Sequence, residues 1–311
     1  MRMMKCGMLG AWVVGLMLGL NVAVTSHAAG PAMAASGDAS AEPLVLAEAL
    51  ADHAAVAPGQ TFMLGVRLTM RPGWHIYWRN PGDSGQATTI NVTAEGVDGI
   101  EVGDIRWPLP HRFELDGGLT NYGYDGTVML TRKITLPDDL GDAGQITLSI
   151  DASWLVCEAT CIPGGRSLAL TLPVAEQPRA STEHAEALGA HEAALPAEPE
   201  ALSDRVSLHV TGGIDPESNQ GVWRLVVDWK DRVPTDVEWF PATDDALMLG
   251  EASIDTAEGT TTIRQPAQRL AGMQPAADTL LMLVAWREPD GQRRGMRIPV
   301  PLMAPPERAA P

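Results

Sequence analysis

The chain has 311 residues, a formal net charge of −17 and only three lysines, at positions 5, 133 and 230. This acidity argues against nucleic acid or an anionic membrane surface as a partner, although it can equally serve solubility alone. The length exceeds that of a typical single domain and predicts two domains.

A signal peptide is predicted at residues 1–28. Two basic residues precede an apolar run from Met8 to Val24, and Ser26-His27-Ala28 follows as a small-x-small cleavage site. An uncleaved anchor is the alternative. Beyond this segment no apolar stretch approaches the ~20 residues of a membrane helix. The mature chain is therefore expected in the periplasm of a Gram-negative bacterium, without a membrane span.

A β-sandwich is predicted at residues 43–175, after a flexible leader at residues 29–42 that is rich in Ala, Gly, Ser and Pro. Short β-prone runs alternate there with turn dipeptides such as Pro58-Gly59 and Asp125-Gly126, a spacing typical of sandwiches. The predicted strands are Leu44–Leu50, Phe62–Met70, Trp74–Trp78, Thr88–Thr93, Val102–Arg106, Val128–Leu136, Gln145–Val156 and Ser167–Val174.

The composition changes at residues 176–203, where Ala, Glu and Pro predominate. This segment is predicted to be a linker, with helical character at Thr182–Ala194. A second, smaller β-domain is predicted at residues 204–303, and a disordered tail at residues 304–311. The strands predicted in the second domain are Val206–Val210, Val222–Trp229, Asp236–Phe240, Ala246–Ile254, Thr260–Ile263, Thr279–Trp286 and Gly295–Pro299.

Aromatic side chains are concentrated in two stretches of the first domain, Pro72–Gly85 and Trp107–Tyr124, in a chain that is only 5% aromatic. Such a density indicates a binding site, but core packing is the simpler explanation for the first stretch. Trp74, Ile76 and Trp78 alternate along a strand and therefore share one face, which we expect to point into the core.

Two tyrosines and two histidines in these stretches are candidate site residues. Tyr122 and Tyr124 lie in a predicted Gly-rich loop, where core packing explains them less well than it explains the tryptophans. His75 and His111 are predicted to be hydrogen-bonded framework residues rather than metal ligands or bases. No metal site and no cofactor is predicted.

The mature chain contains two cysteines, Cys157 and Cys161, because Cys6 is removed with the signal peptide. An even number of cysteines in an oxidising compartment predicts a disulfide. The Cα atoms of a disulfide lie roughly 4.4–6.8 Å apart, whereas residues four apart on one strand lie about 13 Å apart. The strand must therefore reverse through Glu158-Ala159-Thr160, and Pro163 lies where a new strand can begin.

Three interpretations of this cysteine pair are open. One is a minor structural staple at a hairpin tip, since a loop this small contributes only about 2 kcal/mol by chain entropy. Another is a metal pair, but zinc normally takes four ligands and the chain has no second cysteine pair. A redox-active dithiol is favoured, because a disulfide in tight geometry is more easily reduced.

Four motifs follow one another along the first domain. They are Trp107-Pro108-Leu109-Pro110, Asn121-Tyr122-Gly123, Ile134-Thr135-Leu136-Pro137, and Trp154-Leu155-Val156-Cys157 with Cys161-Ile162-Pro163 after it. In this order and spacing they resemble the amino-terminal periplasmic domain of the thiol:disulfide interchange protein DsbD family and of its relatives, the suppressor-of-copper-sensitivity proteins (ScsB). The stretch from Gly73 to Gly85 is similar to the ScsB group in particular. The resemblance covers roughly residues 43–175.

The resemblance implies an all-β, immunoglobulin-like sandwich that relays electrons by thiol–disulfide exchange, a protein-disulfide reductase type of activity. It implies that Cys157 and Cys161 are the redox pair, that Cys161 forms the mixed disulfide and that Cys157 resolves it. It also places a cap, which covers the cysteines until a partner docks, at the loop Leu119–Tyr124. The cap residues are Asn121, Tyr122, Gly123 and Tyr124.

The implied partners are a thioredoxin-like periplasmic protein or domain, which supplies electrons, and oxidised periplasmic proteins, which receive them. Full-length family members continue into a membrane electron channel and a thioredoxin-like domain. This sequence has neither, so a separate membrane electron-transfer protein is expected.

Two other functions stay open. One is a binding or scaffold module with a static disulfide, in a cytochrome-assembly or copper-tolerance system. The other is copper handling by the cysteines together with methionine or histidine. The methionines concerned, Met63, Met70 and Met129, are scattered rather than arrayed, which weakens the copper hypothesis.

Overall fold

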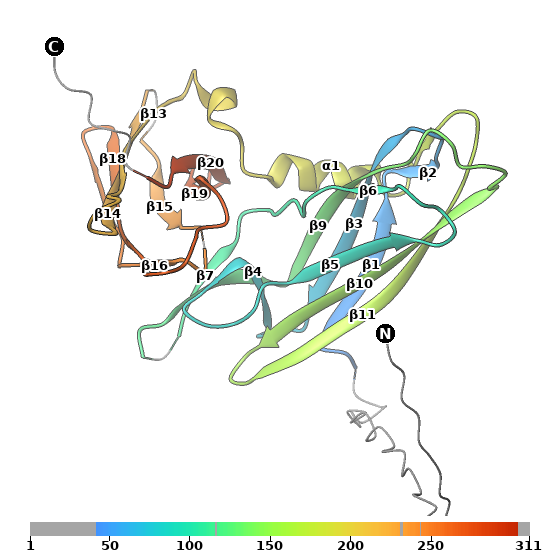
Figure 1. The fold of residues 1–311 in the computed structure, drawn as a ribbon, viewed down its shortest axis with the longest axis horizontal. Helices are drawn as coiled ribbons and strands as arrows, with labels where there is room; N and C mark the ends of the chain where they lie inside the picture. Colours follow the sequence, from blue (N-terminus) through green and yellow to red (C-terminus); the bar gives the residue numbers. More distant parts are fainter. Residues whose placement is uncertain (1–41, 116, 231–232, 243, 304–311) are drawn as a thin grey trace, which may run out of the picture. The chain divides into compact units, whose positions relative to one another are not determined.

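The computed structural model describes residues 42–115, 117–230, 233–242 and 244–303 (Figure 1). The predicted signal peptide at residues 1–28, the predicted leader up to residue 41 and the predicted tail at residues 304–311 lie outside them. From Pro43 onward the described residues form one compact unit. None of the described helices is long and apolar enough to cross a membrane.

Strands joined by short turns make up the amino-terminal region, residues 43–180. Its elements are β1 (Val45–Ala51), β2 (His53–Ala55), β3 (Thr61–Met70), β4 (His75–Gly82), β5 (Thr89–Ala94), β6 (Glu101–Val102), β7 (His111–Glu114), β8 (Thr120–Asp125), β9 (Thr127–Thr135), β10 (Gln145–Cys157), β11 (Cys161–Pro173) and β12 (Arg179–Ala180). One sheet has the order β1-β3-β9-β6. A larger sheet has the order β11-β10-β4-β8-β7, with β5 also paired to β10, and β2 pairs with β12.

The apolar residues of these two sheets form one core. Ile146, Leu148 and Ile150 alternate along β10 and are at most 1% exposed. They belong to one cluster with Leu64 of β3 and Leu130 of β9, which lie in the other sheet. Period-two alternation is what places every second side chain of a strand on the buried face. The predicted β-sandwich is confirmed.

Strand β4 is buried on both of its faces. Ile76 and Trp78 are fully buried in the core cluster and Trp74 packs against it, as the alternation predicts. His75 and Tyr77 point to the other face of the sheet, yet they are only 6% and 1% exposed. The outer face of β4 is therefore covered by other parts of the chain, which alternation within β4 alone does not predict.

The segment predicted as a Gly-rich loop is a strand, so that prediction was wrong. Strand β8 pairs with β4 on one side and with β7 on the other. Gly123 lets the backbone of β8 approach that of β4 closely and does not form a turn. A Cβ at Gly123 would lie 2.0 Å from the carbonyl oxygen of Ile76. The strand predicted from Ser167 is also longer, since β11 begins at Cys161 and pairs with β10 along its whole length.

Residues 176–203, predicted to be a linker, contain regular structure. They form β12, the helix α1 (Ala185–Ala194) and the 3₁₀ helix η1 (Pro199–Leu202). Helix α1 buries Leu188 and His191. The Nε2 of His191 lies 3.0 Å from the hydroxyl oxygen of Thr131, which is fully buried in β9. The helix is therefore packed against the amino-terminal sandwich.

The carboxy-terminal region, residues 206–303, is also built from strands. They are β13 (Val206–Ile214), β14 (Gln220–Trp229), β15 (Thr235–Phe240), β16 (Leu247–Leu249), β17 (Ser253–Ala257), β18 (Thr260–Arg269), β19 (Thr279–Arg287) and β20 (Arg293–Pro301). The single strand predicted at Ala246–Ile254 is divided into β16 and β17, both paired with β18. One sheet has the order β13-β14-β18-β16 and another the order β15-β19-β20.

The carboxy-terminal strands have a buried cluster of their own, centred on residues such as Trp223 and Met282. Three of their residues, however, belong to the core cluster of the amino-terminal sandwich: Phe240, Leu283 and Ala285. The ring of Phe240 lies 6.1 Å from that of Trp78 between centroids, edge to face. The two regions thus share buried apolar surface.

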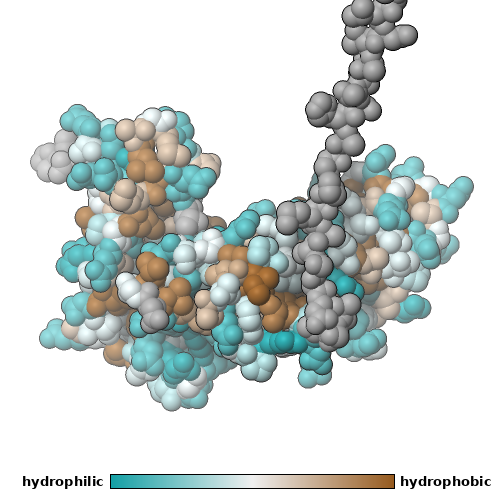
Figure 2. All heavy atoms as spheres, turned by 90° about the horizontal axis from the view of Figure 1, so that it is seen from below, coloured by the Kyte–Doolittle hydropathy of each residue, from teal (hydrophilic) through white to brown (hydrophobic). Residues whose placement is uncertain are grey.

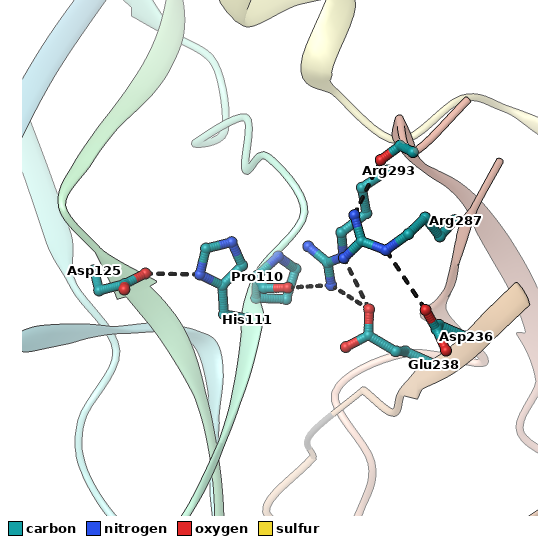
Figure 3. Close-up of polar contacts among 8 residues, drawn as sticks. Pro110, His111, Asp125, Asp236, Glu238, Arg287 and Arg293 are labelled. Atoms are coloured by element: carbon teal, nitrogen blue, oxygen red, sulfur yellow. Dashed lines mark hydrogen bonds and ion pairs between the residues drawn. The ribbon is translucent and has the colours of Figure 1, made fainter. Parts of the chain in front are cut away.

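A polar contact also joins the backbone just before β7 to the carboxy-terminal strands (Figure 3). Arg293 donates to the carbonyl oxygen of Pro110 at 2.6 Å and to the carboxylate of Glu238 at 2.8 Å. Arg287 and Asp236 form an ion pair beside them, with an N–O distance of 3.5 Å. On the face drawn in Figure 2, hydrophobic side chains lie between hydrophilic ones.

Burial of His191 predicts that the protein loses stability in mild acid. Burial lowers the pKa of His191 from 6.5 to about 4, against a smaller opposite effect of Glu192. The unfolded chain therefore binds a proton more readily, and stability is lost as the pH falls from about 6.5 towards 4. His191→Gln should make the unfolding temperature less dependent on pH over this range, as followed by circular dichroism.

The dependence should be weakened but not abolished in that variant, because burial also lowers the pKa of His75. A matched control is His209→Gln, which changes an exposed histidine of β13 and should keep the wild-type dependence. An unchanged dependence in His191→Gln would contradict the assignment.

Candidate functional site

A disulfide closes the tip of the β10–β11 hairpin, whose two strands are drawn in Figure 1. Cys157 is the last residue of β10 and Cys161 the first of β11; they pair directly across the hairpin, with Cα atoms 4.1 Å apart. The chain reverses through Glu158-Ala159-Thr160, as predicted, and the amide of Glu158 donates to the carbonyl oxygen of Thr160 at 3.3 Å. Pro163 is accommodated because β11 lies at the edge of its sheet.

The disulfide lies on the outer face of the larger sheet, away from the sandwich core. Val156 of β10 pairs with Ile76 of β4, and Cys157 pairs with His75. Val156 and Ile76 both belong to the core cluster. Because successive side chains of a strand point to opposite faces, Cys157 and His75 share the outer face, and Tyr77 joins them two residues further along β4.

The Tyr77 hydroxyl contacts both sulfur atoms. It donates to the Sγ of Cys157 at 3.1 Å and lies 3.6 Å from the Sγ of Cys161. The side-chain amide of Asn121, from β8, donates to the same hydroxyl oxygen at 3.3 Å. Burial raises the pKa of Tyr77, although the hydrogen bond from Asn121 partly opposes this. The hydroxyl therefore keeps its proton at neutral pH.

The segment after β4 covers the ring of Tyr77. Gly85 lies directly on this ring, where a Cβ would come within 2.2 Å of a ring carbon. The backbone amide and hydroxyl of Ser84 both donate to the Oδ1 of Asn121, at 3.2 and 3.1 Å. Asn121, which is fully buried, thus connects this segment to Tyr77 and holds the hydroxyl toward the sulfurs.

His75 is the other buried polar residue next to Cys157. Phe113 of β7 stacks on its ring, with centroids 4.5 Å apart, and the Tyr77 ring meets it edge to face at 5.4 Å. Its Nε2 is buried and has no hydrogen-bond partner among the described residues, so the prediction of a hydrogen-bonded framework residue was wrong for this atom. Burial lowers the pKa of His75, against the opposite effect of Asp125, and the imidazole is neutral at pH 7.

His111, in contrast, is a framework residue as predicted. Its Nδ1 lies 2.7 Å from a carboxylate oxygen of Asp125 (Figure 3). Both side chains are about half exposed, and the pair joins the start of β7 to the end of β8. The hairpin that supplies Phe113 and Asn121 is thereby tied together at its open end.

The two cysteines differ strongly in exposure. Cys157 is only 2% exposed, whereas Cys161 and the turn before it are exposed. Ile162, next to Cys161, is 42% exposed. The carboxylate of Glu158 lies over Gly73, where a Cβ would be 2.8 Å from the Oε1. An incoming thiol thus has open access to one sulfur of the disulfide only.

The predicted cap residues lie in β8 but have different neighbours. Asn121 contacts Tyr77, whereas the Tyr122 ring packs edge to face against Trp78 and Phe240. The Tyr124 hydroxyl donates to the carbonyl oxygen of Pro108 at 2.9 Å, and its ring stacks on Trp107. No described contact joins either of these two tyrosines to a sulfur. The methionines considered for copper lie in strands β3 and β9, and Met70 is part of the core.

Tyr77 is a site residue that the sequence alone does not predict. The aromatic density of the stretch around it indicates a site. Because Trp74, Ile76 and Trp78 share the core face of their strand, Tyr77 must lie on the face away from the core. The sequence does not reveal that β4 pairs with β10. This pairing brings the Tyr77 hydroxyl to Cys157, 80 positions further along the chain.

The fold and the site together define an all-β sandwich with a disulfide at an exposed hairpin tip. Residues 41–173 match the family model described as the amino-terminal domain of the thiol:disulfide interchange protein DsbD. The predicted resemblance is confirmed over these residues. The match and the Cys157–Cys161 disulfide relate this part of the chain to thiol–disulfide chemistry in general.

Among solved structures, the chain is similar to the amino-terminal periplasmic domain of ScsB from Proteus mirabilis. The TM-score is 0.59 at 18% sequence identity, over 84% of this chain and 94% of that one. This similarity concerns the fold, and it confirms the predicted immunoglobulin-like sandwich with further β-structure. The sporulation control protein Spo0M from Bacillus subtilis aligns over 83% of this chain and 91% of its own, at 10% identity and a TM-score of 0.24. Comparison with curated proteins finds no match.

The difference in exposure predicts the order in which the reduced cysteines react. With a limiting amount of an alkylating reagent, Cys161 should be modified at least about tenfold faster than Cys157, since the reagent must reach the sulfur. Peptide mass spectrometry of the reduced protein gives both rates. Cys157→Ala and Cys161→Ala, each with one thiol, serve as matched controls. Equal rates at the two positions would contradict the burial described here.

Proposed function

We propose that this chain carries out thiol–disulfide exchange in the periplasm. In this proposal Cys157 and Cys161 accept reducing equivalents from a thioredoxin-like partner, itself supplied by a separate membrane electron-transfer protein. They pass these equivalents to oxidised periplasmic proteins. The observation that carries the proposal is the asymmetric disulfide at the hairpin tip, with Cys161 exposed and Cys157 buried.

The asymmetry supports distinct roles for the two cysteines. Exchange requires a thiolate to approach one sulfur in line with the S–S bond. Exposed Cys161 is the sulfur that a partner can reach, so it forms the mixed disulfide. Cys157 leaves as the buried thiolate and later resolves the intermediate. These are the roles that the family resemblance implies.

The stability of the fold is compatible with a disulfide that opens and closes. A loop of this size contributes about 2 kcal/mol by chain entropy. The sandwich core, in contrast, joins fully buried residues of several strands from both sheets. The S–S bond therefore contributes only a small part of the total stability. The fold can persist while the bond is open, as an exchange function requires.

The roles of the two cysteines can be tested by trapping mixed disulfides. Cys157→Ala, expressed with its predicted signal peptide in a Gram-negative host, should accumulate a covalent adduct through Cys161, because the resolving thiol is missing. Cys161→Ala should trap little. Adducts are detected on non-reducing gels and identified by mass spectrometry, with the double variant as the control.

Other patterns of adducts would change the conclusion. Adducts with Cys161→Ala alone would reverse the two roles and keep the exchange function. The absence of adducts with both variants, together with a large drop in unfolding temperature, would contradict exchange and favour a structural disulfide.

Strand β8 is proposed to shield the disulfide through Asn121. Asn121→Ala removes the hydrogen bonds to Tyr77 and Ser84, and it should speed alkylation of reduced Cys157 several-fold. Tyr122→Ala is the comparison, since its ring packs on Trp78 and Phe240. Tyr122→Ala should change the rate little, and an unchanged rate in Asn121→Ala would contradict shielding by β8.

A further inference from the structure

We infer that Tyr77 is a catalytic residue of the exchange reaction: its hydroxyl stabilises the Sγ of Cys157 as the leaving thiolate. The inference rests on the proposed function and adds a residue that the family resemblance did not assign. It starts from the 3.1 Å hydrogen bond in which the Tyr77 hydroxyl donates to Cys157.

The hydrogen bonds around Tyr77 fix the direction of its proton. A tyrosine hydroxyl has one proton to donate and can accept on its oxygen. The Nδ2 of Asn121 donates to that oxygen, and the Oδ1 of Asn121 is occupied by the amide and hydroxyl of Ser84. The single proton of Tyr77 is therefore left for sulfur, and the arrangement is set before the disulfide opens.

A donor is needed because the sulfur that leaves is buried. Cys157 is 2% exposed, so water cannot solvate the negative charge that develops on it. The hydrogen bond that the structure shows to its Sγ comes from a neutral group, the Tyr77 hydroxyl. A hydrogen bond from a neutral donor to an ionised acceptor is stronger than one between neutral groups. The contact with Tyr77 thus strengthens as charge moves onto Cys157.

The exchange step can be written in full. A partner thiolate attacks the Sγ of Cys161; a new S–S bond forms between them, and the Cys157–Cys161 bond breaks. The bonding electron pair passes to the Sγ of Cys157, which receives the Tyr77 hydrogen bond. A second partner thiolate then attacks the partner sulfur of the mixed disulfide and releases Cys161 as thiolate. The partner dithiol is oxidised by two electrons, the protein disulfide is reduced by two, and the protein thiolates take protons from solvent.

Tyr77→Phe tests this role with little change of shape. The variant keeps the ring that Gly85 covers and removes only the donor. Tyr124→Phe is the matched control, because this predicted cap residue has no described contact with a sulfur: the variant removes a similarly buried hydroxyl from the neighbouring strand, where the partner is the carbonyl oxygen of Pro108. Reduction of the disulfide by a reduced thioredoxin should be about tenfold slower or more in Tyr77→Phe than in wild type. It should be unchanged in Tyr124→Phe.

A second readout separates this role from a structural one. In the Cys161→Ala background, the pH at which Cys157 becomes reactive to alkylation should rise in Tyr77→Phe, because its thiolate has lost a donor. Other titratable groups on this side include His75, Asp125, His111 and Glu158, and Tyr77→Phe retains all of them. Asn121→Asp provides a second variant: the carboxylate accepts a hydrogen bond from the Tyr77 hydroxyl, which then no longer donates to sulfur. Exchange should then slow although the hydroxyl is still present.

The outcomes distinguish this inference from the proposed function. Rates are compared at a temperature where each variant is folded by circular dichroism. Wild-type exchange with equal rates in Tyr77→Phe and Tyr124→Phe would overturn the role of Tyr77 and leave the proposed function intact. A wild-type disulfide that thioredoxin does not reduce would overturn the proposed function itself. An unshifted alkylation profile, or full activity in Asn121→Asp, would also overturn the role of Tyr77.

Discussion

The site depends on the pairing of β4 with β10 at the tip of the larger sheet. Only Val156 with Ile76 and Cys157 with His75 form this short ladder. Its register decides which face each side chain occupies, and a slip of one residue would turn Cys157 into the core and Val156 outward. The apolar residues of the ladder hold that register, because both are buried in the sandwich. Core packing on one face thus positions the sulfur chemistry on the other.

The outer face works as a site because it is covered only in part. Phe113, Asn121 and the glycine-containing segment after β4 close over His75, Tyr77 and Cys157, whereas Cys161 projects beyond this cover. One disulfide therefore has one sulfur in a dry, hydrogen-bonded environment and the other in water. This difference in surroundings gives the two cysteines different chemistry, although they are four residues apart on one hairpin.

Local patterns in the sequence predict what local forces decide. Short β-prone runs between turn dipeptides predict the strands and the sandwich, and the spacing of Cys157 and Cys161 predicts the hairpin turn and its bridge. The sequence does not predict contacts that depend on long-range register. The role of Gly123 is one example, since a glycine that lets β8 approach Ile76 has the same signature as a turn glycine. The contact of Tyr77 with sulfur is another, because it requires the β4–β10 ladder.

Phe240 has a consequence for where this protein can be divided. Its ring packs on Trp78 and Tyr122, and Arg293 binds the backbone just before β7. A chain ended after residue 203 would uncover the aromatic rings on which Phe240 lies, whereas β7, which carries Phe113, would keep its pairing with β8. The segment that matches the family model is therefore not physically independent of the carboxy-terminal strands. A fragment limited to that segment would expose an apolar face to solvent. It would also lack the Arg293 contact just before β7, the strand whose Phe113 covers His75.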